Sequence, residues 1–403
     1  MGGHETPNVH EVTTPTDAEQ PLPHSLQSIV DEWKPQRAER QKRRHLERAD
    51  FDALRDARLL QSVVPVEVGG LWHGVDSSAR NACESLRLLA TADPAVALVS
   101  AMHTAVVGYW LLNPDPTQPE WETQRQAVFA SAMAGEQWGT ITSEPGSGGD
   151  MAKTRATATP ITASAFMAGH AYALSGDKHF GSGSGIADRM VTTAIAAGET
   201  APSIFVLDST DRQWDGSSGW TLTAPWDGVG MGATQSHAMR LDNARSVRLS
   251  TSGGLSDITT KPGPFVATSF AAVIIGVLDE AIAVARAQLA PKAADLRAFE
   301  QVEWTRAVCD HWLCVQAYEG ALHAVETEAP TAMFAALCAK ETIAELAEGI
   351  LTRLCKVIGG GAFSQRSPFA QWHQDVRALG FLRPPWGLAY DSLFSLTFTG
   401  APG

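Results

Sequence analysis

The spacing of apolar residues changes twice along the chain, and this change constrains the fold more than any other feature. From about residue 25 to 133, and again from about 261 onward, apolar residues recur at three- and four-residue spacing, as in helices that bury one face. Between them lie short β-prone runs separated by Gly, Asp and Pro. The sequence predicts an α+β multidomain protein, with an N-terminal α-helical domain (25–133), a middle β-barrel or β-sandwich domain (134–250) and a C-terminal four-helix bundle (251–403).

Length and composition agree with a globular protein of several domains. The chain has 403 residues, of which 44% are hydrophobic and 19% charged, so it is able to bury a large core. Residues 1–24 are polar and rich in Pro and Thr, without an apolar stretch of the kind a signal peptide needs, and we expect a disordered tail. Segment 265–278 is apolar but too short to span a bilayer, so we expect a buried helix and no membrane partner.

The charge of the chain argues against a nucleic-acid partner. Its formal net charge is −13, whereas binding to phosphates needs clustered Lys and Arg. One basic run at 34–48 is interrupted by acidic residues, and we expect it to be the solvated face of an N-terminal helix. The five cysteines lack C-x-x-C spacing, which predicts reduced thiols in a cytoplasmic protein and no metal site.

Two Gly- and Ser-rich segments carry the strongest functional signal. Residues 142–150 read TSEPGSGGD, and residues 177–185 read DKHFGSGSG. Glycines let backbone amides approach a ligand closely, and the hydroxyls of Thr142, Ser143 and Ser182 suit the edge of a heteroaromatic ring. The alternative for each segment taken alone is an ordinary turn between strands.

Together the two segments resemble the flavin-binding middle domain of the acyl-CoA dehydrogenases. In that family a Thr-Glu-Pro-Gly-x-Gly-Ser-Asp turn is followed by a β-ribbon and a Gly-x-Lys-x-Trp-Ile-Thr/Ser loop that closes over the isoalloxazine ring. This chain keeps Lys178, has Phe180 where the family has Trp, and has Ser182 where the family has Thr or Ser. The resemblance covers nearly everything after residue 25. It implies the same architecture, and contact of FAD with the three hydroxyls named above and with the Phe180 ring.

A run of glycines near the C-terminus extends the resemblance. Residues 359–363 (Gly-Gly-Gly-Ala-Phe), followed by Asp-Val-Arg at 375–377, resemble a family segment that meets the dinucleotide part of FAD on a neighbouring subunit. The resemblance therefore implies FAD contacts at Gly359 and Gly360, and a homo-oligomer, either a dimer or a tetramer. The alternative is that Gly359 only caps the preceding helix.

The chain departs from the family at positions that bear on the reaction. The catalytic Glu of the dehydrogenases falls at Arg383, which stays protonated and is unable to act as the base. Gly149 stands where many members have a Ser close to the substrate, and the family's Arg-x-x-Phe-Gly signature for FAD phosphates is absent from 290–297. Arg383 and Gly149 are thus candidate substrate contacts, and FMN or separately supplied reduced flavin becomes an alternative to FAD.

Such losses are also typical of flavin-dependent monooxygenases that resemble dibenzothiophene monooxygenase and share this fold. These enzymes use O2 and reduced flavin supplied separately. They often place a second active-site His in the helix where this chain has His103, for which the alternative is a satisfied helical histidine. If the protein instead dehydrogenates its substrate, Asp391 is the candidate base, and the alternative for Asp391 is a position on the surface.

The sequence leaves the reaction open. The leading interpretation is an FAD-dependent oxidoreductase that acts on the CH–CH group of an acyl thioester, such as an acyl-CoA. The alternative is a reduced-flavin monooxygenase that uses O2 and has a flavin reductase as its partner. The third is a non-catalytic scaffold that has kept the fold.

Overall fold

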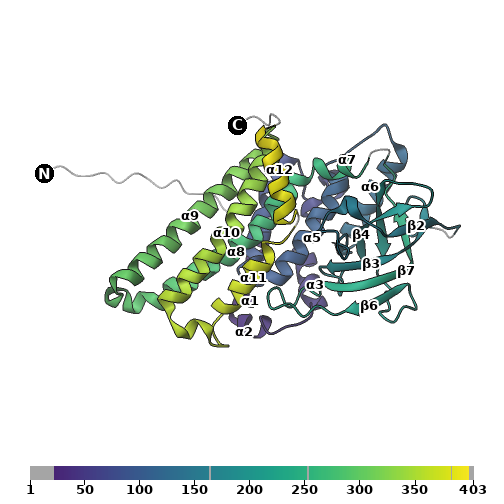
Figure 1. The fold of residues 1–403 in the computed structure, drawn as a ribbon. Coiled ribbons are helices and arrows are strands. Elements are labelled where there is room, and N and C mark those ends of the chain that lie inside the picture. The colour runs from purple at the N-terminus through teal and green to yellow at the C-terminus, as the bar shows by residue number, and fades with distance from the viewer. Residues whose placement is uncertain (1–21, 163–164, 252–253, 383, 399–403) are drawn as a thin grey trace.

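The computed structural model describes residues 22–162, 165–251, 254–382 and 384–398. Helices lie at both ends of the chain and strands lie between Trp138 and Arg248, so the predicted α+β class is confirmed (Figure 1). The exact limits of the domains stay a prediction. Helix α1 begins at Leu22, inside the segment 1–24 that was expected to be a tail, and residues 1–21 are outside the described residues.

The first part of the chain is helical, and its central helix is α5. Asp93 accepts hydrogen bonds from the backbone N–H groups of Ala95 and Val96, and Pro94 occupies the first helical position, as the sequence predicts. Because α5 is apolar all round, it is buried among the other elements. The elements of this part are α1 (Leu22–Trp33), η1 (Lys34–Gln36), α2 (Arg37–Arg40), α3 (Arg48–Asp56), η2 (Leu60–Val63), η3 (Val66–Val68), α4 (Val75–Ala90), α5 (Pro94–Leu111) and α6 (Pro119–Met133).

The strands form a closed barrel. Strand β4 pairs with both β2 and β5, so the ring β4–β2–β3–β7–β5 closes on itself, while β1 extends it beside β4 and β6 beside β7. The side chains that point inward, such as Leu174, Met190 and Phe205, make a core of their own. The elements are β1 (Trp138–Thr140), η4 (Met151–Lys153), β2 (Thr157–Pro160), β3 (Ala171–Gly181), β4 (Arg189–Ala196), β5 (Pro202–Asp208), β6 (Trp220–Ala224) and β7 (His237–Arg248).

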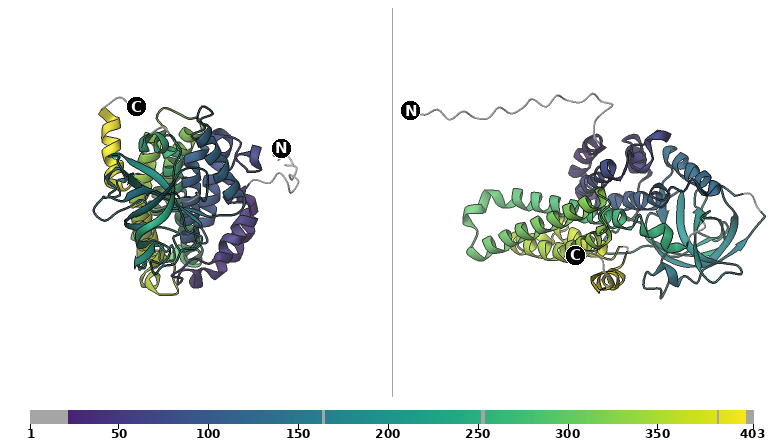
Figure 2. Two further views of the ribbon diagram at one scale, coloured as in Figure 1. Left: turned by 90° about the vertical axis from the view of Figure 1, so that its right-hand side faces the viewer. Right: turned by 90° about the horizontal axis from the view of Figure 1, so that it is seen from above.

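Long helices follow the barrel and pack side by side. Helix α10 contacts α8, α9 and α11, and α8 also contacts α4 and α5, so α8 joins the bundle to the N-terminal helices. Seen from above, the α9–α10 pair extends away from the barrel, which lies at the opposite end of the molecule (Figure 2). The elements are α7 (Leu255–Thr260), α8 (Gly263–Leu289), η5 (Ala290–Asp295), α9 (Ala298–Glu326), α10 (Ala332–Ile358), η6 (Gly360–Phe363), α11 (Phe369–Leu379) and α12 (Trp386–Phe398).

Two helical stretches, Pro94–Leu111 and Gly263–Asp295, are long and apolar enough to cross a membrane by length and composition. Of their most apolar windows, 94% and 89% are buried inside the structure. Burial in the core of this fold therefore accounts for their hydropathy, as expected for segment 265–278.

The basic run at 34–48 does not form one solvated helical face, and this prediction is wrong. It is divided between η1, α2 and a turn. Arg40 is buried, donating from Nη2 to Asp50 Oδ2 and from Nε to Asp93 Oδ2, both at 2.8 Å. A guanidinium with two carboxylate partners is able to enter the core. The spacing of charges within 34–48 gave no sign of Asp50 and Asp93, because both lie outside that run.

Candidate functional site

A cavity of about 530 Å³ lies where the barrel meets helices α5, α8 and α11. Its barrel side carries hydroxyl groups and glycines, whereas its helical side is apolar. The barrel side consists of Thr140, Thr142, Ser143, Glu144, Gly146, Gly148, Gly149, His179, Phe180, Ser182, Trp226, Met231 and Ser236. The helical side consists of Leu98, Met102, Ala105, Val106, Tyr109, Val266, Phe270, Ala378, Phe381, Leu382 and Pro385.

Most of the predicted flavin contacts meet in this cavity. Thr142, Ser143, Phe180 and Ser182 all line it, and so does Gly149, which the sequence offered as a substrate contact. The two motif segments meet because His179 N donates to Ser143 O at 3.0 Å, in a bridge between the two stretches of chain. Two separate sequence motifs thus form one wall.

The other predicted site residues lie elsewhere. Gly359 and Gly360 follow the end of α10 outside the cavity lining, and Gly359, with φ of 84°, caps that helix. Asp391 is exposed on α12 and does not line the cavity. Arg383 is outside the described residues, although Leu382 and Pro385 on either side of it line the cavity.

His103 lies behind the cavity wall. Its Nδ1 accepts from the backbone N–H of Trp138 at 3.1 Å, and its Nε2 donates to Leu60 O at 3.2 Å. These two bonds set the tautomer. Burial lowers the pKa of His103 to about 4, against the opposing effect of the Leu60 hydrogen bond, so the ring is neutral at neutral pH. This geometry is that of a satisfied helical histidine.

Glu144 and Lys178 form a buried ion pair beneath the wall. Lys178 Nζ lies 2.6 Å from Glu144 Oε1 and also donates to Thr193 O at 2.7 Å. Burial alone would raise the pKa of Glu144, but hydrogen bonds from Lys178, Thr154 and the Arg155 N–H outweigh it and lower that pKa. Glu144 is therefore a structural carboxylate that ties the 142–150 turn to β3.

The hydroxyl wall fits the edge of a flavin ring. Thr142 Oγ1 is buried and has no hydrogen-bond partner among the described residues, an arrangement that natural structures avoid unless a ligand or water completes it. Ser182 Oγ lies 2.9 Å from Ser236 Oγ, and both side chains line the cavity. These hydroxyls offer donors and acceptors to the nitrogens and carbonyl oxygens of an isoalloxazine ring.

Phe180 stands at the edge of the cavity in an unusual backbone conformation. Its φ is +56°, and its side chain is 57% exposed. The ring lies 4.4 Å from the His179 ring centroid and 6.2 Å from that of Trp226. Because this ring is exposed at the edge of the cavity, it is available to contact a ligand there.

The aliphatic part of the helical wall has no distinct signal in the sequence. Leu98, Met102 and Val106 follow one another at four-residue spacing on α5, and Phe270 faces them from α8. Apolar residues at this spacing are indistinguishable from core residues until the barrel is placed beside the helix. Among the described residues, no group of three or more His, Cys, Asp or Glu side chains is arranged to hold a metal ion.

Comparison with known proteins identifies the class of fold. No protein-family model matches the chain, and no curated protein matches it by sequence. Solved structures do match over almost the whole chain. They show that the chain has the acyl-CoA dehydrogenase-like fold, which confirms the resemblance read from the sequence.

Three of these structures define the likeness. FMN-bound TdsC from Paenibacillus sp. A11-2, elsewhere described as a dibenzothiophene monooxygenase, has a TM-score of 0.77 at 19% identity, covering 94% of this chain and 97% of its own. KijD3 in complex with FMN and a dTDP-amino-sugar has a TM-score of 0.79 at 22% identity, covering 95% and 94%. Methanesulfinate monooxygenase MsuC from Pseudomonas fluorescens has a TM-score of 0.77 at 19% identity, covering 95% and 98%.

These neighbours change the order of the functional interpretations. Two are described as monooxygenases and two hold FMN, and they favour the alternative, oxygenation, over the acyl-CoA dehydrogenase reading that the sequence put first. At such low sequence identity, the likeness to these structures concerns the fold alone. The reaction has to be argued from the residues of the cavity.

Proposed function

We propose that this protein is a flavin-dependent monooxygenase that takes up reduced FMN and uses O2 to oxygenate a small, largely apolar molecule. The observation that carries the proposal is the cavity with one hydroxyl-bearing wall and one apolar wall. Reduced flavin, when bound, supplies two electrons and activates O2. The hydroxyls of Thr142, Ser143 and Ser182 would hold the ring edge, and Phe180 would lie against the ring.

The same cavity argues against acyl-CoA dehydrogenation. Removal of an α-proton needs a base within hydrogen-bond reach of the substrate. Among the described lining residues the only carboxylate is that of Glu144, which Lys178 already engages and whose pKa is lowered. Asp391 and His103 lie outside the lining. The absence of a free carboxylate among these residues supports oxygenation.

FMN is the proposed form of the cofactor in place of FAD. TdsC and KijD3 are described with FMN, and the Arg-x-x-Phe-Gly signature for FAD phosphates is absent from residues 290–297. A flavin that is used in the reduced state has to be reduced elsewhere, so the proposal includes a flavin reductase as a partner.

The substrate proposed for the remaining space is uncharged and apolar. The wall opposite the hydroxyls includes Leu98, Met102, Val106, Val266 and Phe270, which would exclude water from the reacting atoms. TdsC is described in complex with FMN and indole, a molecule of this kind. By contrast, a phosphorylated sugar would bring charges that these side chains leave unpaired.

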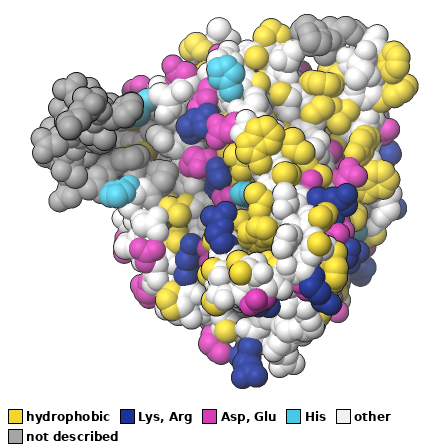
Figure 3. All heavy atoms as spheres, turned by 90° about the vertical axis from the view of Figure 1, so that its left-hand side faces the viewer, with side chains coloured by type: hydrophobic (Ala, Val, Ile, Leu, Met, Phe, Trp, Pro, Cys, Tyr) yellow, Lys and Arg dark blue, Asp and Glu magenta, His cyan; other side chains and the backbone are white. Residues whose placement is uncertain are grey.

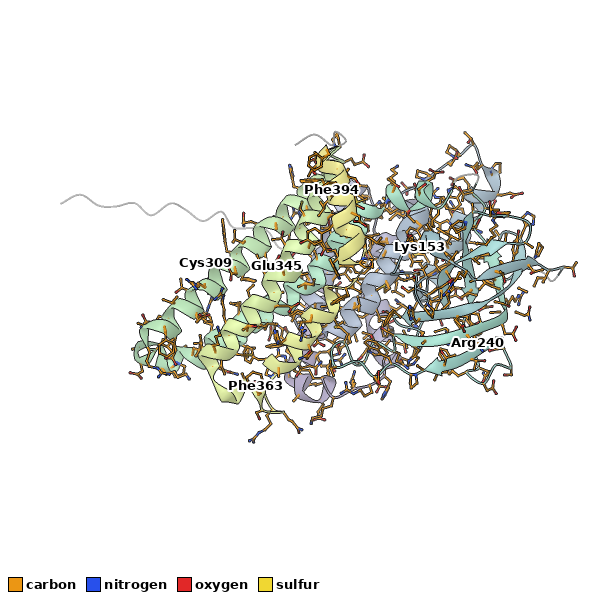
Figure 4. The ribbon with its side chains drawn as sticks, in the orientation of Figure 1. Lys153, Arg240, Cys309, Glu345, Phe363 and Phe394 are labelled. Atoms are coloured by element: carbon orange, nitrogen blue, oxygen red, sulfur yellow. The ribbon has the colours of Figure 1, made fainter. Side chains whose placement is uncertain are left out.

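We also propose that the protein is a homo-oligomer. Helix α12 carries Trp386, Tyr390, Phe394 and Phe398 at four-residue spacing, all between 50% and 76% exposed. Phe394 projects from this helix at the outer surface of the bundle (Figure 4). Hydrophobic side chains are also exposed on the end of the molecule that the bundle forms (Figure 3). An aromatic stripe of this size is typical of an interface.

The proposed function is tested by adding flavins and ligands to the purified protein. Anaerobic titration with reduced FMN should quench or shift the flavin spectrum with saturation, and admission of air with indole should give an oxygenated product. A panel of acyl-CoA thioesters should leave bound oxidised flavin unbleached. Bleaching by an acyl-CoA would overturn the proposal in favour of dehydrogenation, and failure to bind either FMN or FAD would favour the scaffold.

A further inference from the structure

Three hydroxyl groups form a continuous hydrogen-bonded chain that begins at the cavity. Ser182 Oγ lies 2.9 Å from Ser236 Oγ, which lies 2.8 Å from Thr234 Oγ1. Thr234 Oγ1 lies 2.8 Å from the backbone oxygen of Met231. Ser182 and Ser236 line the cavity, whereas Thr234 is completely buried. Each hydroxyl carries one hydrogen, so the chain has two possible directions.

In the first direction every hydroxyl donates away from the cavity. Thr234 donates to Met231 O, Ser236 donates to Thr234, and Ser182 donates to Ser236. The lone pairs of Ser182 Oγ then face the cavity, where they accept a hydrogen bond from a donor on the ligand.

In the second direction every hydroxyl donates toward the cavity. Thr234 donates to Ser236, Ser236 donates to Ser182, and Ser182 donates to an acceptor on the ligand. Both hydroxyl-to-hydroxyl bonds survive the change with donor and acceptor exchanged. The only bond given up within the protein is the one from Thr234 to Met231 O.

The surroundings of Met231 O make this loss small. That oxygen also accepts from Trp226 Nε1 at 2.9 Å and from the backbone N–H of Thr234 at 3.1 Å. Because a carbonyl oxygen has two lone pairs, it stays satisfied when the Thr234 hydroxyl turns away. The chain is therefore able to present either a donor or an acceptor at Ser182 with little loss of stability.

The backbone keeps the three hydroxyls in register. Gly183 N donates to Thr234 O at 2.8 Å, and Ser184 Oγ donates to Gln235 O at 2.7 Å. These bonds join the loop that carries Ser182 to the loop that carries Thr234 and Ser236. The two loops thus fix the distances between the three hydroxyl oxygens without help from a ligand.

We propose that this hydroxyl chain is a two-way switch that lets Ser182 bind the flavin ring in both of its redox states. A flavin ring nitrogen that has a lone pair in the oxidised state gains a hydrogen on reduction, so its partner has to change from donor to acceptor. Ser236 and Thr234 are positioning residues that act through Ser182. The inference rests on the proposed flavin site and adds to it the means by which one serine serves both states.

The decisive variant is Thr234→Val, which removes the hydroxyl and keeps the shape of the side chain. Among the hydroxyls of the hydrogen-bonded chain, Ser182 is then the one remaining acceptor for Ser236. The direction in which the hydroxyls donate toward the cavity is therefore favoured. The dissociation constant for reduced FMN should rise relative to that for oxidised FMN by roughly three- to tenfold, the range for one hydrogen bond. The midpoint potential of bound FMN should fall accordingly. Both constants are measured by titration, in air for oxidised FMN and anaerobically for reduced FMN.

Two further variants separate the switch from a general effect on packing. The double variant Thr234→Val/Ser236→Ala frees Ser182 from the bias and should restore the wild-type ratio of the two constants. Ser246→Ala removes a buried hydroxyl that donates to Tyr172 O and belongs to neither loop, so it should leave the ratio unchanged. Thr234→Ala, which lacks the same hydroxyl, replaces Thr234→Val if the latter does not fold.

The outcomes are distinguishable. Wild-type protein that binds neither state of FMN contradicts the proposed function itself, before any variant is made. Wild-type protein that binds FMN, with Thr234→Val leaving the ratio unchanged or lowering both affinities equally, overturns the switch and leaves the proposed function intact. A ratio that stays altered in the double variant also overturns the switch.

Discussion

At the residue scale, sequence motifs located one wall of the cavity and left two interpretations open for single residues outside it. Thr142, Ser143 and Ser182 were predictable because a short motif fixes both their chemistry and their local turn. His103 was not, because its role depends on Leu60 and Trp138, which meet it only in the folded protein. A titratable side chain in a helix gives no sign of whether it faces a ligand or the core.

The buried ion pair beneath the wall gives the first prediction. Lys178→Met should lower the free energy of unfolding by about 3–5 kcal/mol, because it leaves the Glu144 carboxylate buried without its cation. The double variant Glu144→Gln/Lys178→Met should recover part of that loss. Since the pKa of Glu144 is lowered in the folded state, its contribution is present at neutral pH and lost in acid as the carboxylate protonates. Urea denaturation measures all of these, and equal stability of Lys178→Met and wild type would contradict the assignment.

His103 gives the second prediction. His103→Leu should lower the free energy of unfolding by about 2–4 kcal/mol, because Leu60 O and the Trp138 N–H lose their partner, while the affinity for FMN stays unchanged. A stable variant that has lost flavin turnover would instead indicate a catalytic role.

The difference in stability between wild type and His103→Leu should depend on pH. In the unfolded state His103 takes up a proton near pH 6.5, whereas in the folded state its pKa is about 4. Its contribution to stability is therefore complete above about pH 6.5 and declines as the pH falls toward 4. The stability difference between wild type and His103→Leu should thus be larger near pH 7 than near pH 4.5, and comparing the two proteins removes the effect of groups that both contain.

At the element scale, long helices were predictable and short strands were not. Within the region predicted to be the C-terminal bundle, apolar residues recur at helical spacing over 265–289, 299–326 and 332–358. These ranges agree closely with α8, α9 and α10, because each pattern repeats over many turns. Strands β1 and β6 have three and five residues, too few to show a recognisable β-prone run in the sequence. Their position depends on pairing with β4 and β7, which is a property of the assembled barrel.

The contact between the 142–150 turn and the segment before α12 gives the third prediction. Gly146 and Gly149 have the same φ of +82°, but a Cβ on Gly149 would lie 2.5 Å from Pro385 Cγ, whereas a Cβ on Gly146 would meet nothing within 4 Å. Gly149→Ala should therefore push the turn away from Pro385 and lower the affinity for FMN several-fold. Gly146→Ala, with the same backbone strain, is the matched control and should keep that affinity.

Titration with FMN measures the effect of the clash with Pro385 on affinity, and urea denaturation measures the effect of the left-handed backbone on stability. Both variants should lose a similar amount of stability, about 1 kcal/mol, from the left-handed backbone alone. Only Gly149→Ala should show the additional loss of affinity. Equal affinities in the two variants would show that the contact with Pro385 does not shape the cavity.

At the scale of the whole molecule, the cavity exists because three parts of the chain meet. The motifs revealed the barrel side, whereas the helical side comes from α5 and α8, whose apolar residues read as ordinary core. No local pattern states that a barrel will rest against these helices. The motifs thus predicted the barrel side of the cavity, whereas the apolar side on which the proposal of oxygenation also rests was not predictable.

The aromatic stripe on α12 gives the fourth prediction. Wild-type protein should be a homo-oligomer by light scattering, and Phe394→Asp/Phe398→Asp should lower its mass, because two charges would be buried in the interface. Ser392→Asp places a charge on another face of the same helix and should leave the mass unchanged. A monomeric wild-type protein, or a double variant of unchanged mass, would contradict the interface.

The most direct test of oxygenation by this protein is a single turnover with isotope-labelled O2. The protein is loaded anaerobically with reduced FMN, mixed with labelled O2 and an apolar aromatic compound such as indole, and the product is analysed by mass spectrometry. If the protein is a monooxygenase, the product contains one labelled oxygen atom, and Ser182→Ala protein gives little product. An unlabelled product, or oxidation of an acyl-CoA to its enoyl form without O2, would contradict this function.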